Sequence, residues 1–72
     1  MNQEKQIHTG VLAVWLEKRS FGFIIPDIGG SEVFVHHSDF VGGVLPKNTR
    51  VQYELTPFNG RTKAVKVKAV QS

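Results

Sequence analysis

Cysteine is absent from the 72-residue sequence, which excludes disulfide bonds and thiolate metal sites. Nothing therefore points to an oxidising compartment, and we expect a cytoplasmic protein. The first ten residues, MNQEKQIHTG, contain no apolar run, so we expect neither a signal peptide nor a membrane partner. Acidic residues are fewer than basic ones, six against nine, and the net charge of +3 favours an anionic partner.

The sequence also lacks internal repeats and helical spacing of apolar residues, which instead recur at every second position or in short runs. This pattern predicts an all-β fold. A chain of this length buries only about 60% of its unfolded surface, so it has room for one core. We expect a single domain over residues 8–70, preceded by a flexible polar tail over residues 1–7.

Five segments have the composition of β-strands: residues 9–17, 21–26, 32–37, 50–56 and 61–70. Glycine-containing turns after the second and fourth strands predict hairpins, and residues 38–49 predict a long connection with one short helical turn. Five short strands favour a closed antiparallel barrel because closure removes exposed edges. In the last strand, alternation predicts Val65 and Val67 on one face and Lys66 and Lys68 on the other.

Aromatic residues occupy alternate positions of the second and third predicted strands. Successive strand side chains point to opposite faces, so the aromatic residues should share one face. The opposite face carries Ile24, Val33 and Val35, which suit a barrel interior. The rings should therefore face outward. An exposed apolar face needs a partner. The outward side chains are those of Phe21, Phe23, Phe34 and His36.

Cationic residues flank these rings at Lys18, Arg19, Arg61 and Lys63. Rings stack on base faces while cations contact phosphates, so this combination favours single-stranded nucleic acid. A protein partner is the alternative, because an exposed apolar face can also dock a protein or a second copy of the chain.

Two segments resemble the ribonucleoprotein motifs of the bacterial cold-shock domain family. RSFGFI, Arg19 to Ile24, is similar to Lys-Gly-Phe-Gly-Phe-Ile, and VFVHH, Val33 to His37, is similar to Val-Phe-Val-His-Phe. The motifs have the family's separation, and the resemblance covers roughly Gly10 to Val67. It implies a five-stranded OB-fold barrel that binds single-stranded RNA and DNA by stacking, as an RNA chaperone or regulator. It assigns stacking roles to Phe21, Phe23, Phe34 and His36.

The chain departs from the family pattern at several positions. Ser20 replaces a glycine, which should restrict access to positive φ, and His37 replaces a phenylalanine, which should weaken stacking at that position. In the first strand, an ungapped comparison places Trp15 on a family phenylalanine. We favour a turn one residue shorter, which places Trp15 on the aromatic face and Val14 and Leu16 inside.

Two further phenylalanines have alternative roles. Phe40 either extends the stacking row or closes the barrel end as a core residue, and the second role is favoured. Phe58 either contacts a base or packs the last turn, and the sequence leaves both open. The complete predicted nucleic-acid site is Trp15, Lys18, Arg19, Phe21, Phe23, Phe34, His36, His37, Phe58, Arg61 and Lys63.

Metal binding and catalysis are disfavoured. Adjacent strand residues point apart, so His36 and His37 should not chelate one ion, and the sequence shows no nucleophile motif or phosphate loop. We therefore expect no cofactor and no enzyme activity. Two function classes remain: a single-strand binder, and an OB-type module that docks a protein or itself. The protein would be a monomer or, by exchange of strands, a homodimer.

Overall fold

The computed structural model describes residues 7–70 and contains all five predicted strands. The predicted tail, residues 1–7, lies outside the described residues except for its last position. No helix within residues 7–70 is long and apolar enough to cross a membrane. The elements are β1 (His8–Leu16), β2 (Phe21–Pro26), β3 (Val33–His36), the short 3-10 helix η1 (His37–Asp39), β4 (Arg50–Phe58) and β5 (Arg61–Ala69).

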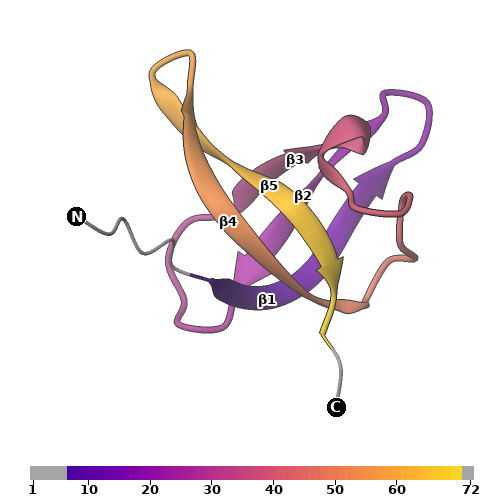
Figure 1. Ribbon diagram of the computed structural model, residues 1–72, viewed down its shortest axis with the longest axis horizontal. Coiled ribbons are helices and arrows are strands. Elements are labelled where there is room, and N and C mark those ends of the chain that lie inside the picture. The colour runs from indigo at the N-terminus through magenta and orange to yellow at the C-terminus, as the bar shows by residue number, and fades with distance from the viewer. Residues whose placement is uncertain (1–6, 71–72) are drawn as a thin grey trace.

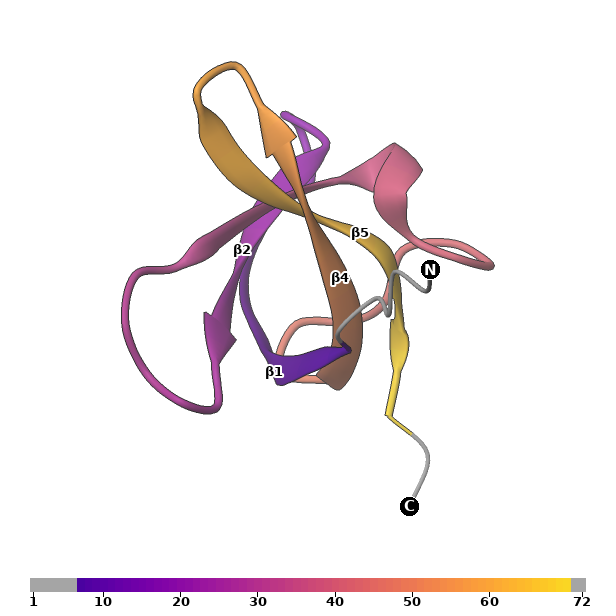
Figure 2. The same ribbon diagram turned by 60° about the vertical axis from the view of Figure 1, so that its left-hand side comes forward.

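The strands close into a barrel in the order β1-β2-β3-β5-β4 (Figure 1). Four of the pairings are antiparallel, as predicted, whereas β3 and β5 pair in parallel at Phe34 and Lys63. Residues 37–49 lead the chain from β3 to β4, and the turned view in Figure 2 shows this segment beside the barrel. The β4–β5 hairpin extends beyond the other strands in both views.

Buried apolar side chains from all five strands fill the barrel. Ile24 and Val35 are fully buried, and Val33 packs against them while partly exposed, so the predicted interior face is confirmed. Phe40 is 8% exposed and belongs to the core, as favoured from the sequence. Within residues 7–70, the buried apolar side chains are those of Leu12, Ile24, Val35, Phe40, Val51, Tyr53, Ala64 and Val67.

An irregularity in β5 contradicts the predicted alternation of that strand. Ala64 and Val67 are the buried residues, three positions apart, whereas Val65 is only partly buried. The pairing of β4 with β5 shifts register there, and Lys66 adopts a positive φ of 54°. A β-bulge adds one residue to a strand and so reverses the alternation beyond it. The sequence-based assignment of Val65 and Val67 to one face is therefore wrong.

The turn between β1 and β2 depends on the conformation of Ser20. Its φ is 63°, so the serine adopts the left-handed conformation that the family glycine would adopt more easily. The Ser20 amide donates to the Leu16 carbonyl oxygen at 2.8 Å, and the Ser20 carbonyl oxygen accepts from the His37 amide at 2.9 Å. These two hydrogen bonds hold the turn against the end of β3.

Candidate nucleic-acid interface

Four phenylalanine rings form a continuous surface, the aromatic platform, across the outside of β2, β3 and the end of β4. Neighbouring rings have centroids 5.3 to 6.2 Å apart. In the pairing of β2 with β3, Phe23 lies opposite Phe34, so both rings emerge on the same side of the sheet. The platform residues are Phe21, Phe23, Phe34 and Phe58.

Alternation along β2 accounts for the outward direction of these rings. Gly22 and Ile24 are buried, whereas Phe21 and Phe23 are only partly so. In β3, the partly exposed Phe34 likewise precedes the fully buried Val35. The predicted division between an aliphatic inner face and an aromatic outer face is therefore present in the structure.

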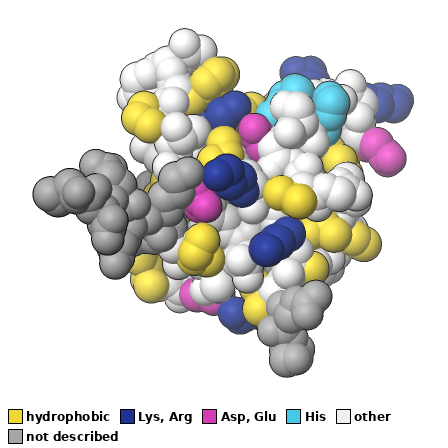
Figure 3. Space-filling view, viewed as in Figure 1, with side chains coloured by type: hydrophobic (Ala, Val, Ile, Leu, Met, Phe, Trp, Pro, Cys, Tyr) yellow, Lys and Arg dark blue, Asp and Glu magenta, His cyan; other side chains and the backbone are white. Residues whose placement is uncertain are grey.

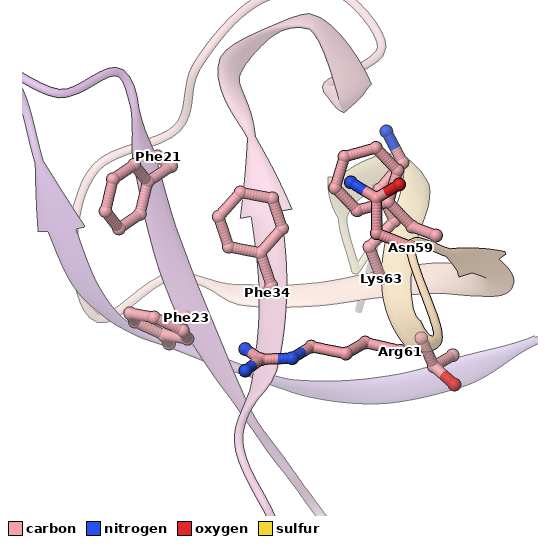
Figure 4. A pocket seen from close by; sticks show the side chains of 8 residues that line it. Phe21, Phe23, Phe34, Asn59, Arg61 and Lys63 are labelled. Carbon is pink, nitrogen blue, oxygen red and sulfur yellow. The ribbon is translucent and has the colours of Figure 1, made fainter.

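The platform forms one wall of a pocket of about 390 Å³ (Figure 4). The β4–β5 hairpin supplies the polar part of the lining, and the Arg61 side chain extends from it toward the rings of β2 and β3. Asn59 and Thr62 also line the pocket, although neither belongs to the site predicted from the sequence. The lining residues are Phe21, Phe23, Phe34, Phe58, Asn59, Arg61, Thr62 and Lys63.

Phe58 packs within the platform and also retains an accessible surface. Its ring lies parallel to that of Phe34 within 5°, and the Lys63 ammonium lies 4.6 Å from its centroid. Cations favour this position over a ring face because of the ring quadrupole. Phe58 nevertheless remains 43% exposed, so a packing role in the hairpin leaves ring surface available to a base.

An ion pair lies beside this part of the platform. The Lys63 Nζ is 3.2 Å from Asp39 Oδ2, and the two side chains are only 19% and 12% exposed. Asp39 Oδ2 also accepts the backbone N–H of His36 at 3.3 Å, which caps η1. The sequence gives no signal of this contact, because Lys63 is 24 positions away from Asp39.

Lys18 and Arg19 lie in the exposed turn between β1 and β2 and do not line the platform pocket. Their turn is hydrogen-bonded to His37 through Ser20, so it lies at the end of the barrel that carries η1. Among the predicted cations, only Arg61 and Lys63 therefore reach the pocket.

The two adjacent histidines lie side by side. Their ring centroids are 4.5 Å apart, because β3 ends at His36 and η1 begins at His37. The expectation that they point apart is therefore wrong, since strand alternation does not continue into a helix. His36 lies opposite Phe21, and its Nδ1 accepts the backbone N–H of Ser38 at 3.3 Å.

Histidine side chains gather beside lysine or arginine at one end of the molecule (Figure 3). Within residues 7–70, no three histidine, aspartate or glutamate side chains are grouped as metal ligands would be.

Trp15 occupies the opposite face of β1 from the one predicted. It pairs with Gly22, and its ring packs edge-on against Phe40 with the centroids 5.4 Å apart. A Cβ on Gly22 would collide with the Trp15 ring, which therefore lies over this glycine. Val14 and Leu16 lie opposite Phe23 and Phe21, on the outer face.

The cause of this difference is a register shift between Leu12 and Val14, where one extra residue of β1 reverses the alternation. The prediction that Trp15 joins the platform, with Val14 and Leu16 inside, is therefore wrong.

The closed five-stranded barrel with aromatic residues on its outer surface is consistent with an OB fold. Residues 8–70 match the model of the family described as the 'Cold-shock' DNA-binding domain, and the chain belongs to that family. A curated cold shock protein from Arthrobacter globiformis is 44% identical over 41 residues. That match covers 53% of this chain and 61% of the relative's length.

A solved structure, drosophila Unr CSD456, superposes with a TM-score of 0.79 at 19% identity. It covers 93% of this chain and 28% of the Drosophila chain, and it supports the fold.

Proposed function

We propose that this chain is a single-strand-binding protein that stacks bases of RNA or DNA on the aromatic platform. The observation that carries the proposal is the joining of four phenylalanine rings to Arg61 and Lys63 in one pocket. Rings supply contacts that tolerate different bases, and the cations attract the phosphate backbone. Such a protein keeps RNA unpaired, which is the action of an RNA chaperone.

The platform also explains why single strands should be preferred to duplexes. Base–ring stacking contributes about 1 to 3 kcal/mol per base, and it requires base faces that pairing and stacking hide in a duplex. The fourth ring, Phe58, continues the row across the β3–β5 junction, so successive bases have adjacent ring surfaces to follow.

Self-association or docking of a protein is the second candidate, favoured by a specific feature of β1. Val14 and Leu16 extend the outer face with aliphatic side chains opposite Phe23 and Phe21, and Leu16 is 41% exposed. Aliphatic surface of this kind suits a protein better than a base. If this candidate is correct, the protein will dimerise in sedimentation experiments, and oligonucleotides will not alter that equilibrium.

The deciding experiment is a titration of a labelled oligothymidine followed by fluorescence anisotropy at several salt concentrations. Phe34→Ala should weaken binding by about 1 to 3 kcal/mol with little loss of stability. Val35→Ala is the matched neighbour: it should lower the free energy of unfolding by about 1 to 3 kcal/mol while the folded protein keeps its affinity. Duplex DNA should bind much more weakly than the single strand.

Saturable binding that weakens with salt and depends on Phe34 supports the proposal. The absence of single-strand binding at micromolar protein contradicts it, and so does an affinity for duplex equal to that for the single strand.

A further inference from the structure

The carboxylate of Asp39 pairs with the ammonium of Lys63, one of the two cations that line the platform pocket. Asp39 Oδ2 and Oδ1 are 3.2 and 3.5 Å from the Lys63 ammonium, which itself lines the platform pocket. We propose that Asp39 competes internally with nucleic-acid phosphate for Lys63 and thereby lowers the affinity and the salt dependence of the single-strand site. This inference rests on the proposed function.

Burial strengthens the competition. The Asp39 and Lys63 side chains are 12% and 19% exposed, so water screens their attraction less than it would screen a pair on the open surface. Asp39 is also held in place, because the same carboxylate accepts the His36 backbone N–H and caps η1. A phosphate that approached Lys63 would therefore meet a fixed negative charge beside the ammonium.

Lys63 is restrained as well. Its ammonium lies over the Phe58 ring, and its backbone pairs with Phe34 where β3 meets β5. The lysine is thus directed toward Asp39 by two contacts besides the ion pair itself. Asp39 makes the net charge of the pocket close to zero around Lys63. This part of the pocket therefore favours the uncharged bases over the phosphates.

Arg61 differs from Lys63 in this respect. It lines the same pocket but is exposed, and no ion pair joins it to a carboxylate within residues 7–70. Its guanidinium carries several donors in a planar arrangement that fits phosphate oxygens. Arg61 is therefore the pocket cation that contacts the backbone, and Lys63 contributes charge to binding only when Asp39 is removed.

The test compares Asp39→Asn with the wild-type protein by anisotropy of a labelled oligothymidine between 50 and 200 mM salt. Asparagine retains an oxygen that can accept the His36 N–H, so the cap of η1 is preserved. Freeing one cation should tighten binding about three- to tenfold at the lowest salt. It should also steepen the plot of log affinity against log salt by about 0.7, the increment for one more neutralised phosphate on a single strand.

Asp27→Asn is the matched control. Asp27 also pairs with a cation, Arg50 at 2.9 Å, but neither residue lines the pocket. The substitution changes the net charge by the same amount, so it measures the general effect of charge on binding. Asp39→Asn should exceed this control in both affinity and salt slope.

A comparison of two single variants, Arg61→Gln and Lys63→Gln, does not depend on the stability of Asp39→Asn. Arg61→Gln should lower the salt slope by more than Lys63→Gln does, because only the arginine charge is uncompensated. In the Asp39→Asn background, Lys63→Gln should abolish the gain in affinity.

The inference is overturned if Asp39→Asn and Asp27→Asn change the affinity and the salt slope equally. It is also overturned if Lys63→Gln lowers the salt slope as much as Arg61→Gln does. After either of these results, the proposed function remains supported if the protein still binds single strands and Phe34→Ala weakens that binding. If no variant binds single strands, the proposed function fails and this inference fails with it.

Discussion

The rings of Phe34 and Phe58 lie parallel within 5°, with their centroids 6.2 Å apart, although 24 positions separate the two residues in the chain. The pairing of Phe34 with Lys63 brings β5 beside β3. The tight Asn59–Gly60 turn joins β5 to the end of β4, so Phe58 also lies close to β3. Both turn residues have positive φ, 51° and 77°, which suits a two-residue hairpin. The hairpin thus places a fourth ring next to the three supplied by β2 and β3.

Phe58→Ala should therefore weaken single-strand binding by about 1 to 3 kcal/mol, the contribution of one stacked base. Stability should change little, because the ring is 43% exposed and its loss leaves no buried cavity. The control is Val41→Ala, which shortens an exposed apolar side chain outside the platform pocket. Oligothymidine titrations of the two variants should differ; equal affinities would assign Phe58 to packing of the hairpin alone.

Regular alternation made part of this site predictable from sequence. Between Phe21 and Ile24 the strand has no bulge, so the outward rings and the buried aliphatic residues follow from spacing alone. The faces of Trp15 and Val65 were predicted wrongly, because each lies beyond a register shift. A bulge adds a residue without leaving a clear sequence signal.

The Asp39–Lys63 ion pair and the stacking of Phe58 on Phe34 were also beyond sequence reasoning. Both depend on the closure of β3 against β5, which brings together residues far apart in the chain. Local spacing contains no information about such a contact. The glycine-containing turn after the fourth strand predicted a hairpin, but it did not predict which residues the hairpin contacts.

Trp15→Phe should leave single-strand affinity within about twofold of the wild-type value, because the indole packs against Phe40 and outside the platform pocket. The smaller ring should instead lower the free energy of unfolding by about 1 to 3 kcal/mol, since it fills less of the space over Gly22. Urea denaturation and oligothymidine titration of the same preparation measure the two quantities. A large loss of affinity in folded protein would place the indole in contact with the ligand.

Ser20→Gly should stabilise the protein by roughly 0.5 to 1 kcal/mol. The serine has a φ of 63°, a conformation that costs an L-residue about 1 to 2 kcal/mol, and glycine avoids this cost while adding entropy to the unfolded chain. Ser31→Gly is the control, because Ser31 is exposed and does not have positive φ. Ser31→Gly should leave the free energy of unfolding unchanged or lower it. A Ser20→Gly protein less stable than wild type in urea would show that the serine side chain contributes more than its backbone costs.

Tyr53 should make stability decrease in alkaline solution. Burial in the core, followed by the negative charge of Asp27, raises the pKa of its hydroxyl above the usual value of 10.0. The unfolded state therefore loses this proton at lower pH than the folded state, so unfolding is favoured once the pH exceeds about 10. The stability linked to this group is complete below that pH and is lost as the pH rises through the pKa of the folded protein.

Tyr53→Phe removes the titrating group, so urea unfolding at pH 8 and pH 11 should show a smaller decrease in stability for the variant than for the wild-type protein. Equal decreases would mean that Tyr53 does not account for the alkaline loss of stability.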